Sequence, residues 1–242
     1  MSSAKARRAA LEGLRREVAL GNRIIERFGL SNAFGHASAR IPGTDTFYFP
    51  TRRSPGFASA GTLLVLDTEG KVRSGRGEPN SELWIHARLY AARPDVGAVV
   101  HAHPPACICL TQIGQPHRIV YNQGGAFHAG VPEFERIGLI RSPELGDLLA
   151  RRLGAGIAVM MRGHGITTAL PDLRSAVVAA CLLEESAGLQ LRMLAAAGGD
   201  AARLRVYGEE EAARVSDQLS PRVVERAWEY YSAAARERPL GG

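Results

Sequence analysis

Short apolar segments of strand character alternate with longer amphipathic segments of helical character along the whole chain, and this mixture limits the fold most. Residues 35–50 and 61–75 each combine two short alternating segments with a turn between them, which predicts two hairpins. The mixture predicts an α/β protein with three α/β/α layers, in which helices cover both faces of one sheet. Because hairpins join antiparallel strands, the central sheet is expected to be mixed and largely antiparallel.

The other elements follow from hydrophobic periodicity and from the residues that start and stop helices. Helices are predicted at 4–28, 83–93, from Pro104 onward, and at 146–153, 171–198 and 220–237; a buried strand is predicted at 96–103 and two more within 157–170. Residues 121–130 form a glycine-rich loop without periodicity. Since no repeat or long linker interrupts the pattern, a single domain is expected over residues 1–242.

Composition limits the class of partner. The net charge is +6, with much of the excess near the start of the chain, but no Lys/Arg tract is interleaved with aromatic residues. An anionic small molecule is therefore a better expectation than nucleic acid. The three cysteines, Cys107, Cys109 and Cys181, do not form a disulfide framework. With no apolar leader and no run of membrane-spanning length, a cytoplasmic protein without a membrane partner is expected.

Two histidines, His101 and His103, stand two positions apart at the end of an apolar strand, in the stretch VVHAHPP. Side chains at i and i+2 of a strand point to the same face, so both rings can reach one ion. Burial at a strand end favours neutral imidazoles, which are the ligating form. The alternative is one ring in the core bonded to a carbonyl group and the other ring at the surface.

A third histidine, His164, lies between two glycines at another predicted strand end, in MRGHGITT. Flanking glycines allow close backbone approach or unusual dihedral angles. A third imidazole at the edge of the same sheet would complete a three-histidine site with open positions for a substrate.

The segment EPNSELWIHARLY places Glu82 at the start of a predicted helix, with Asn80 and Ser81 suited to the N-cap. A carboxylate in the first turn can simply complement the helix dipole. It can also be a general acid/base beside a metal ion. The spacing leaves these two alternatives open.

In the same order along the chain, these motifs resemble four blocks of the class II aldolase/adducin family. The blocks are GHASAR (35–40), NSELWIHARLY (80–90), VVHAHPPAC (99–107) and MMRGHGITTAL (160–170), the last followed by a helix that contains LLEESA. The resemblance covers nearly the whole chain from the first helix to about residue 198. It implies a class II aldolase-like fold and a homotetramer with active sites between subunits.

The resemblance also implies roles for individual residues. His101, His103 and His164 would hold a divalent metal ion (Mn2+, Zn2+, Co2+ or Fe2+), and Glu82 would be the catalytic acid/base. The loops that bind the anionic end of a substrate in the sugar-phosphate aldolases correspond to Gly35, His36, Ser38, Asn80 and Ser81. Those aldolases usually have Gly-Asn where this chain has Gly-His, which argues against phosphate binding. Adducin-like members, which serve as non-catalytic interaction modules, lack the metal histidines.

A subgroup resembles the chain more closely in GHASAR, FYFPTRRSPGFAS (47–59) and GVPEFERIGLIRSPELGDLLARRLG (130–154). It comprises the metal-dependent aromatic decarboxylases, such as those acting on 3,4-dihydroxyphthalate and on 3-hydroxy-2-methylpyridine-4,5-dicarboxylate. The expected function is therefore decarboxylation of a hydroxylated aromatic dicarboxylate. The ortho-hydroxy carboxylate would chelate the metal ion, and the ring carbon that carries the carboxylate would be protonated. Arg53, with Arg52 as a substitute, would pair with the spectator carboxylate.

Tyr121 is a further candidate for lining the pocket, either within one subunit or across a subunit boundary. Two alternatives stay open: a class II aldolase that cleaves a sugar phosphate or a hydroxy-keto acid, and a non-catalytic module of the adducin type.

Overall fold

The centre of the protein is a mixed sheet, seen in a computed structural model that describes residues 2–237. Within these residues the sheet has eight strands in the order β4-β3-β2-β1-β5-β8-β7-β6. Every neighbouring pair is antiparallel except β6 and β7, so the prediction of a mixed, largely antiparallel sheet is confirmed. The strands are β1 (His36–Arg40), β2 (Thr46–Phe49), β3 (Leu64–Asp67), β4 (Val72–Ser74), β5 (Ala98–Ala102), β6 (Glu133–Phe134), β7 (Ala158–Met161) and β8 (Gly165–Leu170).

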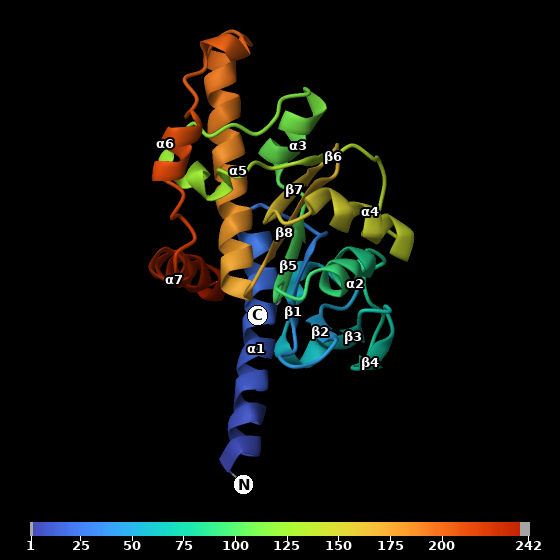
Figure 1. Ribbon diagram of the computed structural model, residues 1–242. Helices are drawn as coiled ribbons and strands as arrows, with labels where there is room; N and C mark the ends of the chain where they lie inside the picture. Colours follow the sequence, from blue (N-terminus) through green and yellow to red (C-terminus); the bar gives the residue numbers. More distant parts are fainter. Residues whose placement is uncertain (1, 238–242) are drawn as a thin grey trace.

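Helices cover both faces of this sheet, as the three-layer prediction requires (Figure 1). One layer contains α1, α5 and α7, and the opposite layer contains α2 and α4. The helices are α1 (Ser2–Arg27), α2 (Leu83–Ala92), α3 (Pro105–Gln112), α4 (Pro143–Leu153), α5 (Leu173–Ala196), α6 (Glu209–Arg214) and α7 (Pro221–Glu237). Four short 3-10 helices lie in the connections, at Pro55–Phe57, Ala60–Thr62, Asn122–Phe127 and Ala201–Arg203.

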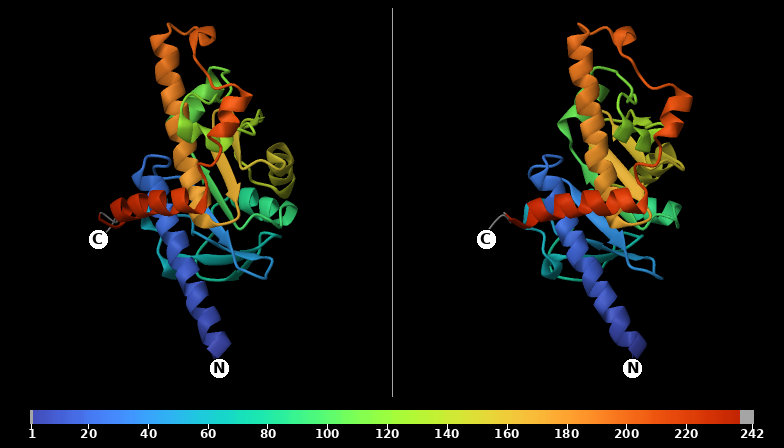
Figure 2. Two further views of the ribbon diagram at one scale, coloured as in Figure 1. Left: turned by 60° about the vertical axis from the view of Figure 1, so that its left-hand side comes forward. Right: turned by 90° about the vertical axis from the view of Figure 1, so that its left-hand side faces the viewer.

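Two long helices extend beyond the sheet in opposite directions. The N-terminal half of α1 projects at one end of the molecule and the C-terminal half of α5 at the other, while α7 crosses over both helices (Figure 2). The ring of Phe28, just after α1, packs edge-on against Tyr231 of α7 at 4.7 Å between centroids. None of the helices in residues 2–237 has the length and apolar character needed to cross a membrane.

Alternation along the two central strands decides which side chains face α2. In β5, Val100 packs into the core beneath α1 and α5, whereas Val99 packs with α2 and α4. His101 follows this alternation and faces the α2 side. In β1, Ala37 belongs to the core beneath α1 and α5, and Ser38 contacts α2. The polar residues of two neighbouring strands are therefore collected on one face of the sheet.

Two local features differ from the sequence-based expectation. The helix expected to be capped by Asn80 and Ser81 begins at Leu83, with Glu82 in the N-cap position. Asn80 instead stabilises the turn just before the helix, because its Oδ1 accepts a hydrogen bond from the Glu82 N–H at 2.9 Å. Strand β6 was not predicted, since its two residues are too few to show a period.

Candidate metal centre and its cavity

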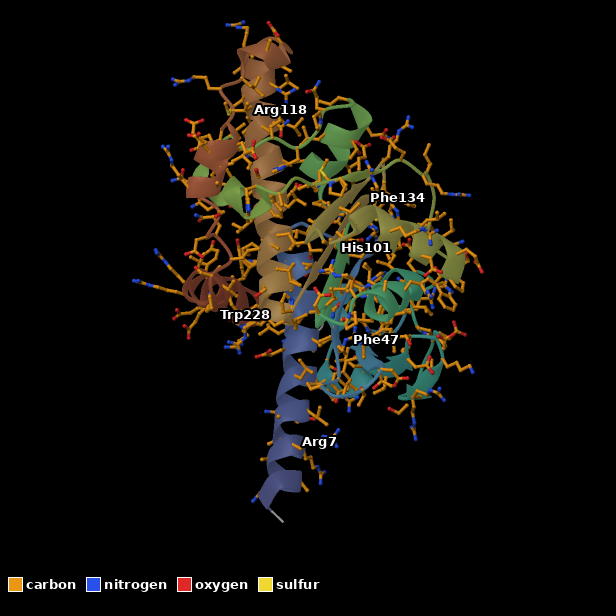
Figure 3. The ribbon with its side chains drawn as sticks, in the orientation of Figure 1. Arg7, Phe47, His101, Arg118, Phe134 and Trp228 are labelled. Carbon is orange, nitrogen blue, oxygen red and sulfur yellow. The ribbon has the colours of Figure 1, made fainter. Side chains whose placement is uncertain are left out.

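His101 is fixed at the end of β5 by a hydrogen bond on the far side of its ring. Its Nδ1 lies 2.9 Å from the Ile166 carbonyl oxygen on β8. A carbonyl oxygen only accepts, so the His101 proton is on Nδ1 and Nε2 carries a lone pair. Burial holds the pKa of His101 well below its ordinary value, so the ring is neutral. Figure 3 shows His101 in the sheet layer, between α5 on one side and α2 with α4 on the other.

His103 follows β5 directly, and the start of α3 fixes its position. The His103 N–H donates to the Leu30 carbonyl group at 2.8 Å. Three and four residues further on, the N–H groups of Ala106 and Cys107 donate to the Glu184 carboxylate of α5 at 2.9 and 3.1 Å. The His103 Nε2 lies 3.0 Å from the His101 Nε2. Burial lowers the pKa of His103 to about 4, so this ring is neutral too.

His164 lies in the turn between β7 and β8, where both flanking glycines have a structural reason. Gly163 has φ +62°, and its N–H donates to the Thr111 hydroxyl at 3.1 Å. A Cβ on Gly165 would meet the Ala102 carbonyl oxygen at 2.1 Å, so a side chain there would push the two strands apart. Both ring nitrogens of His164 are buried without a hydrogen-bond partner among the described residues. A buried imidazole whose nitrogens have no protein partner is suited to bind a metal ion or another ligand.

Glu82 has one carboxylate oxygen anchored and the other directed to the histidines. Its Oε1 accepts from the Ile140 N–H at 2.9 Å. Its Oε2 lies 3.6 Å from the His164 Nε2 and 3.8 Å from the His101 Nε2. Burial by itself would raise the pKa of Glu82, but the neighbouring rings of His164 and His101 and the hydrogen bond from the Ile140 N–H lower it to about 2. Glu82 is therefore an anion at neutral pH.

Together, Glu82, His101, His103 and His164 form what we call the inner cluster. One ligand atom from each residue lies within 4.8 Å of all the others. Three imidazoles and one carboxylate are a donor set that suits several divalent transition metals. The convergence of the three imidazoles, the unpartnered nitrogens of His164 and the outward hydrogen bond of His101 all fit a bound divalent metal ion.

Behind the inner cluster lies a second group of side chains, called here the buried network. His36 lies opposite His101 in the strand register, and its Nδ1 is 2.7 Å from the His86 Nε2. The Ser38 hydroxyl oxygen lies 2.6 Å from the His86 Nδ1 and 2.7 Å from the Tyr90 hydroxyl oxygen. All four residues are buried, and burial lowers the pKa of His86 to about 3.

The direction of donation in this network follows from counting partners. If Tyr90 donates to Ser38, Ser38 to His86 and His86 to His36, then only the His36 Nε2–H lacks a partner within the described residues. The reverse direction leaves both the Tyr90 proton and the His36 Nε2 unpaired. Since unpaired buried polar groups are costly, the first direction is favoured. It places the proton of His36 on Nε2.

A cavity of about 610 Å³ opens over the inner cluster. It is lined by the predicted residues Arg52, Arg53, Asn80, Ser81, Glu82, His103 and His164, together with Ala33, Phe34, Gly35, Ser54, Leu139, Arg141 and Gly163. His36, Ser38 and Tyr121 are not among the lining residues. His36 and Ser38 instead belong to the buried network, and Tyr121 precedes the 3-10 helix Asn122–Phe127 that packs against α5.

Sequence reasoning did not single out three residues of this region. His86 and Tyr90 looked like ordinary members of a helix, although their spacing of four places both on the face that meets β1. Arg141 lies in the segment GLIRSPE, which carried part of the resemblance but no assigned role. A guanidinium group just before the start of α4 was the available signal.

Comparison with protein families identifies the chain. Residues 16–191 match the model described as the Class II Aldolase and Adducin N-terminal domain. The chain belongs to the class II aldolase and adducin family. A 3,4-dihydroxyphthalate decarboxylase from Arthrobacter keyseri is 33% identical over 205 residues, which cover 77% of this chain and 81% of that protein. A decarboxylase from Talaromyces stipitatus is 29% identical over 249 residues, covering 92% of each chain.

Solved structures of this family agree on the fold. The L-fuculose 1-phosphate aldolase from Glaciozyma antarctica PI12 superimposes with a TM-score of 0.81 at 22% identity, covering 96% of this chain and 91% of that one. The class II aldolase-like architecture predicted from the sequence is therefore confirmed. Since the relatives are decarboxylases and aldolases, the prediction of a carbon–carbon lyase is confirmed at the level of the enzyme class.

Proposed function

We propose that the protein is a metal-dependent decarboxylase of a hydroxylated aromatic dicarboxylate that resembles 3,4-dihydroxyphthalate. The observation that carries the proposal is the inner cluster at the base of a cavity whose outer part bears arginines and apolar side chains. Similarity to 3,4-dihydroxyphthalate decarboxylases at 32–33% identity supports the substrate class.

The three imidazoles of the inner cluster would hold the metal ion, and Mn2+, Zn2+, Co2+ and Fe2+ are all compatible with nitrogen ligands. When bound, such an ion supplies Lewis acidity to a ring oxygen of the substrate. The protein supplies geometry: the His101 ring is fixed from behind by the Ile166 carbonyl group, and the Glu82 carboxylate is fixed by the Ile140 N–H.

Glu82 acts as a proton relay in this proposal. Because it is ionised at neutral pH, its free Oε2 first accepts the proton of the substrate's ring hydroxyl group. It then delivers that proton to the carboxylate-bearing ring carbon, where a C–H bond forms and a keto tautomer results. The C–C bond to the carboxylate breaks next, CO2 leaves, and the electron pair restores the aromatic ring with the charge on oxygen. A proton from solvent neutralises that oxygen.

Substrate contacts are proposed for Arg53, for Arg52 as its substitute, and for Asn80 and Ser81, all of which line the cavity. His36 and Ser38 are proposed to support the site from beneath rather than to bind substrate directly, because both lie in the buried network. Tyr121 would reach a cavity only in an assembly. A homotetramer with active sites at subunit interfaces, as the resemblance implies, is part of this proposal.

The experiment is a CO2 assay on a panel of ortho-hydroxy aromatic diacids with benzene and pyridine rings. The metal-loaded protein should release CO2, a chelator should abolish the release, and one of the four divalent ions should restore it. Full activity in metal-free protein would contradict the proposal. Release of an aldehyde from a phosphorylated ketose, with aromatic diacids inert, would instead identify an aldolase. Protein that takes up no metal ion would identify a non-catalytic module.

A further inference from the structure

Three arginines of the outer cavity, Arg52, Arg53 and Arg141, have no acidic partner among the residues that the structure describes. They line the same cavity as the inner cluster, and we call them the outer arginines. Among the side chains that the structure describes, no carboxylate oxygen lies within 4.0 Å of any of their nitrogen atoms. Elsewhere on the surface, Arg73 and Arg88 form ion pairs with aspartates at 2.5 and 2.6 Å. Three unpaired guanidinium groups around one cavity leave a positive charge for a ligand to balance.

The outer arginines come from two different loops, and each loop is tied to the segment that carries Glu82. Thr51 forms an isolated β-bridge with Pro79, and the Arg52 N–H donates to the Glu78 carbonyl group at 2.8 Å. On the other loop, Arg141 directly follows Ile140, whose N–H holds the Glu82 Oε1. An anion that contacts both loops would therefore also act on the position of Glu82.

Of the two loops, the one that carries Arg141 is more closely coupled to the Glu82 carboxylate. Ile140 is only 1% exposed, whereas Leu139 is 41% exposed, so the loop is pinned at Ile140 and open on either side. A ligand that shifts Arg141 therefore acts on the residue next to Ile140, whose N–H orients the Glu82 carboxylate. Arg52 and Arg53 lie on a loop that, among the described residues, contributes no hydrogen bond to the Glu82 carboxylate.

The apolar side chains that line the cavity indicate the shape of the ligand. Phe34 is 68% exposed and Leu139 is 41% exposed, yet both line this cavity. Exposed apolar groups beside unpaired guanidinium groups match a flat ring that carries a carboxylate.

We propose that the spectator carboxylate of the substrate is clamped between Arg141 and the Arg52–Arg53 pair, and that Arg141 makes turnover depend on this carboxylate. The effect of Arg141 on turnover rests on the proposed function, whereas the binding of an aromatic diacid by the outer arginines does not. A carboxylate has two oxygens and accepts two guanidinium groups. Binding energy from a group that does not react is thereby used to align Glu82. Arg141 is a specificity-determining and positioning residue, and the site selects diacids over monoacids.

The first test is independent of catalysis and uses phthalate and benzoate as probes, measured by calorimetry on the metal-loaded protein. Phthalate should bind more tightly than benzoate, and R141A should reduce that preference about tenfold or more, the cost of a lost charge-assisted hydrogen bond. R141K should retain part of it. R76A is the matched control, since Arg76 is an exposed neighbour of Arg52 and Arg53 outside the cavity. An unchanged preference in R141A would overturn the proposal, as would tight binding of inorganic phosphate with no binding of phthalate.

The second test uses a substrate pair, an ortho-hydroxy aromatic diacid and the matching ortho-hydroxy monoacid. R141A should lower kcat for the diacid about tenfold more than kcat for the monoacid, while R53A should chiefly raise KM for the diacid. Equal losses of kcat on both substrates would show that Arg141 has no link to the spectator carboxylate. If the wild-type protein releases CO2 from neither compound, the proposed function fails. The phthalate experiment still decides the ligand in that case.

Discussion

The inner and outer parts of the cavity are held in opposite ways. The inner cluster and the buried network behind it lie on strands, at the turns that follow them and on α2, and most of their polar atoms are bonded to one another or to the backbone. Both ring nitrogens of His164 and the His36 Nε2 are buried without a partner among the described residues. The outer arginines lie on loops, are exposed and form no ion pair with any acidic side chain that the structure describes. The difference indicates a division of labour, in which the inner part fixes the chemistry and the outer part recognises the substrate.

The largest effect is expected where an inner ligand is removed. His101→Ala takes away one of three imidazoles, so metal affinity should fall by more than the roughly 10–100-fold typical of changes behind the ligands. Activity should be lost together with the metal ion. Elemental analysis of the purified variant checks this, with His128→Ala, an exposed histidine outside the cluster, as the control. Full metal content in His101→Ala would break the assignment of the inner cluster.

The next effect separates chemistry from metal binding. Glu82→Gln should keep the metal content, because the three imidazoles remain, but should lower turnover by about 10²–10⁴-fold through loss of the proton relay. Elemental analysis and CO2 release on the same sample measure both quantities. An active Glu82→Gln variant would reassign the acid/base role to another residue.

Stability should respond strongly to changes in the buried network. Ser38→Ala leaves the His86 Nδ1 and the Tyr90 hydroxyl group without their shared partner, so the free energy of unfolding should fall by about 1–3 kcal/mol. Ser74→Ala, at an exposed strand position, should change it by less than about 0.5 kcal/mol. Denaturant titrations of both variants give the comparison. If both variants had the same free energy of unfolding, the buried network would contribute nothing measurable to the stability of the fold.

The same network predicts a dependence of stability on pH. Burial lowers the pKa of His86 from its ordinary value of 6.5 to about 3, so between these values the unfolded chain binds a proton that the folded chain does not. Stability should therefore fall as the pH drops below 6.5, by about 1.4 kcal/mol per pH unit for this residue. Denaturant titrations at about pH 7 and about pH 5, with a chelator present, measure the change. A flat profile would contradict a neutral, buried His86.

The smallest effect is expected at the outer arginines. Because their charges are exposed, added salt should screen them and weaken binding of an aromatic diacid only a few-fold. Metal content and the free energy of unfolding should hardly change over the same range of salt. A loss of metal ion on adding salt would contradict the claim that metal binding does not depend on the outer arginines.

That the rings of His101 and His103 lie on one side of the sheet could be predicted from the sequence, because this information is local. The alternation that places His101 and His103 together is a property of one strand, and the glycines beside His164 mark a turn by themselves. The buried network could not be predicted in this way. His86 and Tyr90 follow a helical period whether or not they meet polar atoms, and their partner Ser38 comes from a strand 48 residues away from His86.

The outer part was only half predicted for a related reason. Arg52 and Arg53 were proposed from the stretch FYFPTRRSPGFAS, which carries the subgroup resemblance, but a role for Arg141 follows only from the hydrogen bond between its neighbour Ile140 and Glu82. That contact joins residues 58 positions apart. Loop geometry of this kind is set by tertiary packing and leaves no periodic signal. Elements were recovered more reliably than the contacts between them.

The central claim is that His101, His103 and His164 share one divalent ion, and X-ray absorption spectroscopy of the zinc-loaded protein tests it most directly. The account predicts imidazole nitrogens at about 2.0–2.1 Å from zinc and a loss of that imidazole scattering in His101→Ala. A zinc environment made of oxygen ligands alone, unchanged by the substitution, would contradict it.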